Sequence, residues 1–121
     1  MERKIRRGDM FYADLPFGVG SEQNGCRPLV IISNDTGNKH SNTVITAVIT
    51  SQTENKAKMP THCYINAQQG LGLDSLVLLE QIRTIDKKRL KEYIGTLNGE
   101  VMNRIDRALA VSVGLKEGKE G

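Results

Sequence analysis

Tryptophan is absent from this chain of 121 residues, and its other aromatic residues are only three tyrosines and two phenylalanines. So few rings argue against a nucleic-acid groove built from successive stacked bases. The two cysteines, Cys26 and Cys63, are too few and too irregularly placed for a disulfide framework or a Cys-x-x-Cys zinc site. We therefore expect free thiols in a reducing compartment and no bound metal.

Long apolar runs are absent as well. No stretch approaches the roughly 20 apolar residues that cross a bilayer, and the basic N-terminus is not followed by an apolar segment of signal-peptide length. The 38% apolar and 26% charged residues are typical of a globular domain. We expect one domain over residues 1–121, located in the cytoplasm and without a membrane partner.

The positive charge is concentrated at one end of the chain. Residues 1–7 hold four basic groups and one acidic group, a balance of +3 that equals the net charge of the whole chain. We interpret residues 1–6 as a basic arm on a neutral body, and residues 116–121 as a frayed tail. Because the body is neutral, any binding of nucleic acid must depend on a local site.

Apolar alternation and β-branched residues predict a series of short strands. Their expected ranges are residues 8–15, 27–33, 43–49, 61–66, 75–85 and 93–97. The segment 75–85 is the most apolar and is expected to be a long, bent central strand. Residues 34–41 consist of turn-forming side chains, and Asp86 is placed to cap one helical turn through Arg89.

The hydrophobic period changes after Asn98, which is a good N-cap. Apolar or small residues then recur at three- and four-residue steps, namely Val101, Met102, Ile105, Ala108, Leu109 and Ser112 or Val113. This period predicts a C-terminal helix that stops near Gly114. Many short strands followed by one helix indicate a mainly β fold, arranged as a small closed or half-closed barrel with a covering helix.

The stretch from Gly18 to Ile32 joins a glycine-rich loop to an apolar strand, and Arg27 lies at the junction. Pro28 biases Arg27 toward an extended backbone, so the guanidinium leaves from a stiff segment that a ligand under the loop can reach. The same residues also fit a surface hairpin with a solvated arginine. The loop lacks the Gly-Lys-Ser/Thr ending of a nucleoside-triphosphate loop.

Further blocks accompany this stretch along the chain. In order, the blocks are Arg7-Gly8-Asp9, Gly20-Ser21-Glu22-Gln23 with Gly25 and Arg27-Pro28, Thr50-Ser51-Gln52, and Leu79-Glu80-Gln81-Ile82-Arg83-Thr84-Ile85-Asp86. With these blocks the chain resembles the MazF/PemK family of toxin endoribonucleases over roughly residues 6 to 115. The resemblance implies an SH3-like barrel of the PemK/MazF/CcdB type, a homodimer, and a cognate MazE-like antitoxin with an acidic, disordered tail.

The resemblance places Arg27 and Thr50 at the family's two catalytic positions. RNA carries its own nucleophile, the 2′-hydroxyl, so neither a metal nor another cofactor is expected. The planar guanidinium of Arg27 suits two phosphate oxygens, although its high pKa makes it a poor proton donor. The hydroxyl of Thr50 is suited to donate to a phosphate oxygen or to orient the nucleophile. Taken alone, Thr50 also fits a β-branched residue that simply ends a strand.

Side-chain amides and carboxylates can read the edges of unstacked bases. The predicted RNA-binding residues are Phe17, Ser21, Glu22, Gln23, Ser51, Gln52, Gln81 and Arg83. Gln81 and Arg83 fit ordinary polar positions on a sheet equally well, and Glu22 is also a candidate proton acceptor. His40 and His62 have no partner at metal-ligand spacing and are expected to be structural or solvated. We therefore expect no bell-shaped rate profile centred on histidine titration.

The predicted protein is a toxin of a toxin–antitoxin system that cleaves single-stranded RNA, messenger RNA in particular. Cleavage is expected to be sequence-specific and to need neither metal nor ribosome. Two other classes stay open at this point. One is a non-enzymatic poison of DNA gyrase on the same fold, and the other is an RNA-binding regulator without turnover.

Overall fold

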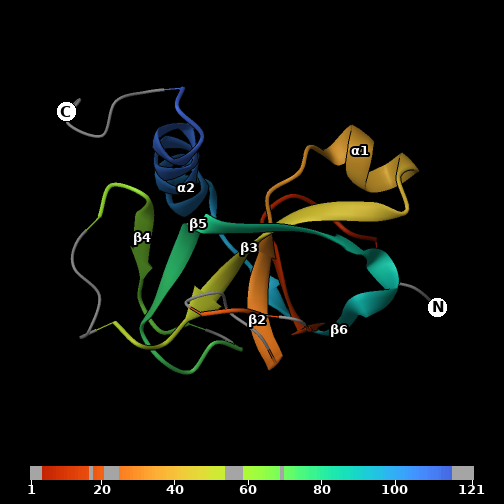
Figure 1. The fold of residues 1–121 in the computed structure, drawn as a ribbon, viewed down its shortest axis with the longest axis horizontal. Coiled ribbons are helices and arrows are strands. Elements are labelled where there is room, and N and C mark those ends of the chain that lie inside the picture. Colours follow the sequence, from red (N-terminus) through yellow and green to blue (C-terminus); the bar gives the residue numbers. More distant parts are fainter. Residues whose placement is uncertain (1–3, 17, 21–24, 54–58, 69, 116–121) are drawn as a thin grey trace.

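The computed structural model describes residues 4–16, 18–20, 25–53, 59–68 and 70–115. Its elements follow one another as drawn in Figure 1. They are β1 (Asp9–Leu15), β2 (Gly25–Ile31), α1 (Asp35–His40), β3 (Thr43–Thr50), β4 (His62–Ile65), β5 (Ser75–Asp86), the 3-10 turn η1 (Lys87–Arg89), β6 (Leu90–Thr96) and α2 (Gly99–Ser112).

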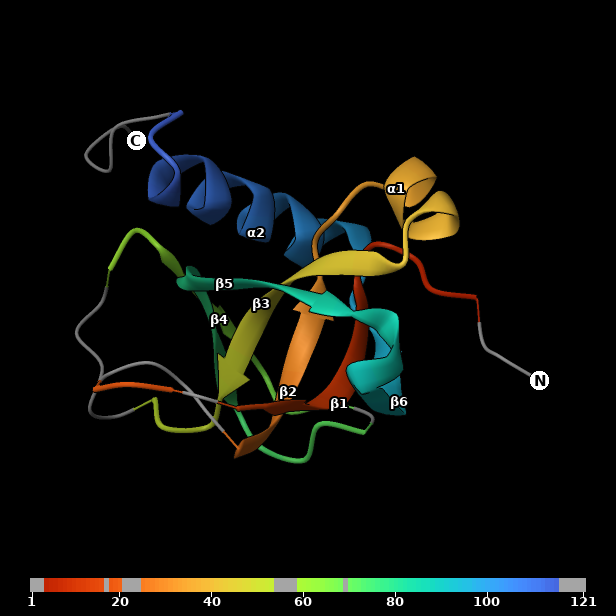
Figure 2. The same cartoon turned by 45° about the vertical axis from the view of Figure 1, so that its right-hand side comes forward.

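The strands form one antiparallel sheet in the order β4-β5-β3-β2-β1-β6. Within the described part of the chain, β4 and β6 are the two edges and do not pair with each other. The expected mainly β fold with a C-terminal helix is confirmed. The sheet is open, however, and is not closed into a barrel. Figure 2 shows its strong bend, with α2 lying across one side.

The bend has a visible cause in β5, which was predicted to be long and bent. This strand is 12 residues long, and its pairing with β3 is irregular. Ala47 faces Ile82, whereas the next residue, Val48, faces Leu78. The additional residues on β5 form a bulge, and bulges bend and twist the strand that carries them. The half of β5 before the bulge pairs with β4 as well as β3.

The covering helix α2 forms as the sequence predicts. The Asn98 side chain accepts a hydrogen bond from the Val101 amide at 3.0 Å, and Gly114 has a φ of +82° just beyond the last turn. Ser112 turns toward the sheet and donates to the Leu79 carbonyl at 2.5 Å, whereas Val113 is 54% exposed. Neither described helix has the length and apolar character needed to span a bilayer.

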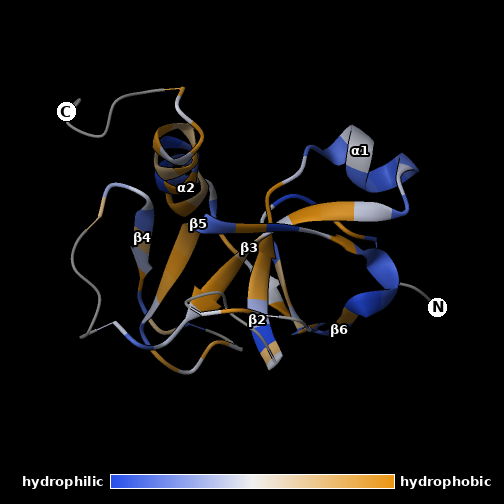
Figure 3. Ribbon diagram, in the orientation of Figure 1, coloured by the Kyte–Doolittle hydropathy of each residue, from blue (hydrophilic) through white to orange (hydrophobic). Residues whose placement is uncertain are grey.

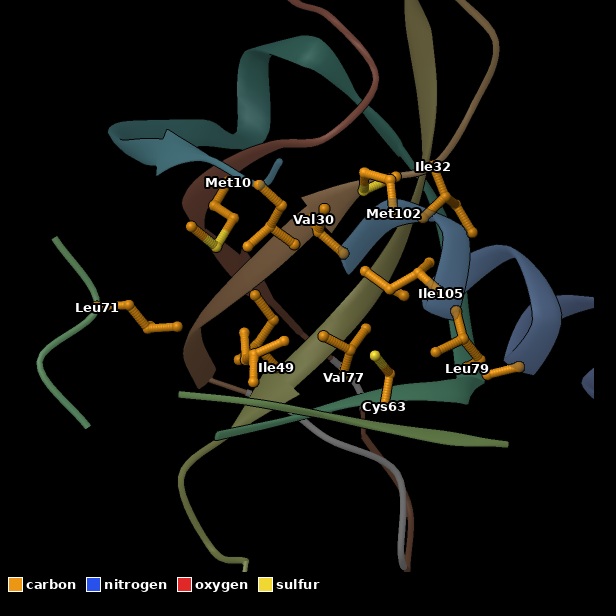
Figure 4. Packing of buried hydrophobic residues seen from close by; sticks show 14 of the residues in the cluster. Met10, Val30, Ile32, Ile49, Cys63, Leu71, Val77, Leu79, Met102 and Ile105 are labelled. Carbon is orange, nitrogen blue, oxygen red and sulfur yellow. The ribbon is translucent and has the colours of Figure 1, made fainter. Parts of the chain in front are cut away.

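Two clusters of apolar side chains lie on opposite faces of the sheet. The first packs under α2 and is shown in Figure 4, where Met102 of the helix lies beside Val30 and Ile32, and Ile105 lies toward Val77 and Leu79 of β5. The second is formed on the other face by Phe11, Ala13, Leu15, Leu29, Ile31, Val44, Val48 and Ile85. In Figure 3 the central strands are accordingly orange, whereas α1 and η1 are largely blue.

Helix α1 was not predicted, because residues 34–41 were expected to be turn throughout. Turn-forming side chains here cap a short helix, since the Asn34 side chain accepts from the Gly37 amide at 2.7 Å. Asn38 is only 2% exposed, and its amide group donates to the Ser33 carbonyl at 2.8 Å. The expected turn after Asp86 is confirmed as η1, with the Asp86 carboxylate accepting from the Lys88 amide.

Candidate functional site

Arg27 lies in the first half of β2, at the point where this strand leaves the core. It is half-buried and faces Ala13 of β1. Cys26 before it is exposed, whereas Leu29 beyond it is fully buried. Figure 3 shows a blue band near the lower end of β2, below the orange part of the strand. Gly25, with a φ of +81°, begins the strand in a conformation that other residues rarely adopt.

Thr50 ends β3, and β3 is the direct neighbour of β2. Leu29 of β2 faces Val48 of β3, where the β2–β3 pairing ends; the same antiparallel register carried two residues onward would set Arg27 opposite Thr50. Because side chains alternate along a strand, Arg27 and Thr50 then share the face of Leu29 and Val48, away from α2. Directly opposed residues have Cβ atoms about 5 Å apart, a separation at which two side chains can contact one phosphate.

The hydroxyl of Thr50 is held in place by the chain that follows it. Thr50 is only 4% exposed, and its Oγ1 accepts a hydrogen bond from the Gln52 amide at 3.2 Å. That bond uses a lone pair and leaves the hydroxyl proton able to donate. Ser51 and Gln52 are exposed at the end of β3, so the chain brings three predicted site residues together.

Arg83 lies on β5 opposite Thr46, whose hydroxyl donates to the Arg83 carbonyl at 2.9 Å. The Arg83 guanidinium donates through Nη2 to the Pro16 carbonyl at 3.1 Å. Pro16 directly follows β1, so this contact ties β5 to the start of the β1–β2 connection. Arg83 therefore has a structural contact in addition to its predicted role toward RNA. Gln81, half-buried, lies in the bulge of β5.

Four predicted RNA-binding residues, Phe17, Ser21, Glu22 and Gln23, lie outside the described residues. All four belong to the connection between β1 and β2, whose two ends are the site of the Arg83 contact and the strand that carries Arg27. Their assignment stays a prediction from the sequence.

The two histidines differ in their surroundings. His40 is exposed at the end of α1, whereas the His62 side chain is only 5% exposed. Its Nε2 lies 2.8 Å from a Glu80 carboxylate oxygen, and Thr61 donates to the other oxygen at 3.1 Å. His62 is thus packed at the β4–β5 pair, and its buried Nδ1 has no hydrogen-bond partner there. No group of three or more potential metal ligands gathers in the part of the chain that the structure describes.

Tyr64 is a residue that sequence reasoning missed. It is 46% exposed on β4, and its hydroxyl donates to Asp74 at 2.9 Å. The other Asp74 oxygen accepts from the Ala67 amide at 2.7 Å. This amide bond first, and the phenol second, lower the pKa of Asp74, while the bond to Asp74 raises the pKa of Tyr64. The sequence feature that indicates an exposed Tyr64 is its alternation with Cys63 and Ile65, which are both buried.

A basic hollow lies elsewhere, between the N-terminal arm and α1. Its lining includes Lys4, Arg6, Lys39 and Asp35. The Arg7 amide donates to Asp35 at 2.7 Å. This hydrogen bond is the main cause of the lowered pKa of Asp35, to which the charges of Arg6 and Arg7 also contribute. The hollow is therefore a cationic surface with one fixed carboxylate.

Comparison with known proteins gives concordant similarities. The family model of PemK-like, MazF-like toxins of type II toxin–antitoxin systems matches residues 6–113. An endoribonuclease from a mycobacterial species, solved with its cognate antitoxin, is 28% identical, with a TM-score of 0.76 over 93% of this chain and 97% of that one. A second mycobacterial endoribonuclease is 26% identical, with a TM-score of 0.74 over 93% of each chain.

A third similar structure is MazF from Deinococcus radiodurans. It has a TM-score of 0.78 at 20% identity and covers 93% of this chain and 99% of that one. At this identity the match shows a common fold.

Proposed function

The chain belongs to the PemK-like, MazF-like toxins of type II toxin–antitoxin systems, and from this premise we propose that it is an endoribonuclease. Its substrate is single-stranded RNA, messenger RNA above all, which it cuts at a preferred sequence without metal or ribosome. The observation that supports the proposal is the register of β2 against β3, in which Leu29 faces Val48; continued by two residues, this register would set Arg27 opposite Thr50 on one face. Two similar solved proteins are endoribonucleases.

The proposed reaction uses the nucleophile that RNA provides. The 2′-oxygen attacks the adjacent phosphorus, and the bond from phosphorus to the 5′-oxygen breaks. The products are a 5′-hydroxyl and a cyclic phosphate, which water can open to a linear one. Negative charge builds on the phosphate oxygens during this step, and Arg27 with its two parallel donors is suited to bind them. Thr50 supplies a neutral donor from the neighbouring strand.

Two proton transfers accompany this step, one from the 2′-hydroxyl and one to the leaving 5′-oxygen. A guanidinium with a pKa above about 12 is poorly suited to either. We therefore assign Arg27 to charge stabilisation only. Glu22 remains the candidate acceptor for the first proton, on the basis of its sequence position.

We propose that base recognition comes from the polar side chains around this pair. Ser51 and Gln52 are exposed directly after Thr50, and Gln81 lies on the bulge of β5. Single-stranded RNA exposes the edges of its bases, and hydroxyl and amide groups can bond those edges selectively. The sequence adds Phe17, Ser21, Glu22 and Gln23 to the residues proposed to bind RNA.

The proposed partners are a cognate antitoxin and a second copy of this chain, in the cytoplasm. One similar endoribonuclease was solved with its antitoxin, and the basic hollow lined by Lys4, Arg6 and Lys39 offers charge complementary to an acidic tail. Val113 and Leu115 after α2 are 54% and 78% exposed, and such apolar side chains suit a dimer built through α2 and the sheet.

The test is cleavage of one long RNA in the presence of EDTA, followed by sequencing of the new 5′ ends. We expect cuts at a recurring short sequence for the wild type and a loss of about 100-fold or more in rate for Arg27→Ala. Arg27→Lys keeps the charge without the fork and should fall between them. Arg89→Ala, in exposed η1, is the matched control and should cut normally.

Three outcomes contradict the proposal. If Arg27→Ala cuts at the wild-type rate, the active site lies elsewhere. RNA that is bound but never cut by the wild type indicates a passive regulator. Inhibition of DNA gyrase that persists in Arg27→Ala indicates a gyrase poison.

A further inference from the structure

One row of side chains crosses the sheet from the candidate site to the β4 edge. Thr50 of β3 faces Leu76 of β5, and Leu76 faces Tyr64 of β4. Directly paired residues point to the same side of a sheet, so Tyr64 lies on the face of Thr50. Two strand spacings separate them, which amounts to about 10 Å. The neighbours of Tyr64 along β4, Cys63 and Ile65, point to the opposite face and pack under α2.

We propose that Tyr64 is a base-stacking residue, which holds an unpaired RNA base close to the phosphate bound at Arg27 and Thr50. This inference rests on the nuclease function proposed above. It adds a substrate contact on β4, a strand that supplied none of the residues predicted from the sequence. Tyr64 is also the most exposed of the aromatic side chains that the structure describes, at 46% against 37% for Tyr93.

The ring of Tyr64 is fixed before any substrate binds. Its hydroxyl donates to Asp74, and the Asp74 carboxylate is itself held by the Ala67 amide. The backbone is fixed as well, because Arg104 of α2 donates to the Tyr64 carbonyl at 2.8 Å. A side chain held at both ends loses little conformational entropy when a ligand binds to it. Tyr64, the one exposed residue of β4, therefore offers a rigid platform at this edge of the sheet.

The local charge favours a base over a phosphate at this position. Asp74 is exposed beside the ring and, like any carboxyl of ordinary or lowered pKa, is ionised at neutral pH. A carboxylate repels the RNA backbone, whereas the face of a neutral base is compatible with an aromatic ring beside it. Stacking of one base on an aromatic side chain contributes about 1 to 3 kcal/mol. In this arrangement Arg27 binds the phosphate, and Tyr64 stacks on a neighbouring base.

The test measures affinity for an RNA that carries a 2′-deoxynucleotide at the cleavage position and so cannot be cut. Tyr64→Leu should raise Kd by roughly 5- to 100-fold, the equivalent of one lost stacked base. Tyr64→Phe keeps the ring but loses the hydroxyl bond to Asp74, so its Kd should rise much less than that of Tyr64→Leu. Tyr93→Leu removes a ring from the opposite edge of the sheet and is the matched control, with unchanged Kd expected.

Two further readouts separate stacking from a general disturbance. Stacking involves no counterion release, so the ratio of Kd values between Tyr64→Leu and wild type should not change with salt. RNA with a single abasic position, scanned along the site, should lose affinity for the wild type at one position. At that same position Tyr64→Leu should lose nothing more, because the partner of the base is already gone.

The inference is overturned if Tyr64→Leu binds the uncut RNA like the wild type, or if the abasic and Tyr64 effects add at every position. It is also overturned if Tyr64→Leu lowers kcat with unchanged KM, since a stacking residue acts mainly on binding. Failure of the nuclease proposal looks different, because the wild type then leaves the all-ribose RNA uncut. Thermal unfolding of each variant verifies that β4 stays folded.

Discussion

Thr50 offers the sharpest test of the candidate site, because two substitutions separate its shape from its hydroxyl. Thr50→Val keeps the β-branched shape that suits the end of β3 but removes the donor. Thr50→Ser keeps the hydroxyl and removes a methyl group. If Thr50 only ends a strand, valine is the better replacement. If its hydroxyl contacts the phosphate, serine is the better one.

The magnitudes follow from its surroundings. Thr50 is 4% exposed, and its hydroxyl oxygen accepts a hydrogen bond from the Gln52 amide. Gln52 is exposed, so water can replace the lost acceptor in Thr50→Val and stability should change by about 1 kcal/mol or less. Loss of a donor to a developing negative charge typically costs 10²- to 10³-fold in rate, or about 3 to 4 kcal/mol. Activity and stability should therefore respond very differently.

The assay is single-turnover cleavage of a short fluorogenic RNA with enzyme in excess, combined with thermal unfolding of the same samples. We expect Thr50→Val to cut about 100-fold more slowly or worse, with a midpoint close to that of the wild type. Thr50→Ser should retain most of the rate and lose some stability through its missing methyl group. A Thr50→Val protein that cuts at the wild-type rate would refute the assignment, since only the hydroxyl was removed.

Two predictions concern the fold. Ile105 is fully buried between α2 and the sheet, so Ile105→Ala should lower the free energy of unfolding by about 2 to 5 kcal/mol; a loss below 1 kcal/mol in chemical denaturation would mean that α2 packs loosely. Asp35 has a lowered pKa in the folded state, so its contribution to stability is present above its ordinary value of 3.8 and is lost as pH falls through the folded value. Asp35→Asn should therefore weaken the loss of stability on acidification below about pH 4, and an unchanged acid limb in thermal unfolding would contradict the Arg7–Asp35 contact.

Local patterns were enough to predict the elements that depend on their own residues. The period after Asn98 predicted α2 together with its cap, because a helix face and a capping side chain are properties of neighbouring residues. The apolar run from Ser75 likewise predicted a long, bent strand. Helix α1 was missed because Asn34 and Gly37 are typical of turns. Two features of the structure show that the turn continues as a helix: the capping hydrogen bond from the Gly37 amide to the Asn34 side chain, and the burial of Asn38.

The candidate site depends on pairing between distant segments, which a single sequence does not state. Arg27 was singled out from the loop and strand around it, and its pairing with Thr50 across adjacent strands was predicted; the strand order confirms that β2 and β3 are neighbours. Strand β3 pairs on one side with β2, which precedes it in the sequence, and on the other side with β5, which is separated from it by β4 along the chain. Tyr64 was missed because only the pairing of β4 with β5 brings it into the row of Thr50.

The register that aligns these residues is enforced by the core and not by the site itself. Ile49 is fully buried in the cluster under α2, and its neighbour Thr50 points to the other face. A slip of one residue in β3 would exchange these faces and place the Thr50 hydroxyl in the apolar cluster under α2, where a hydroxyl without a hydrogen-bond partner costs about 1 to 3 kcal/mol. The same slip would exchange the faces on which Ala47 and Val48 lie. The apolar packing of the sheet thus fixes the face on which Thr50 lies, which is the face of Leu29 and Val48, and substitutions in that core should disturb the proposed cleavage only when they change the register.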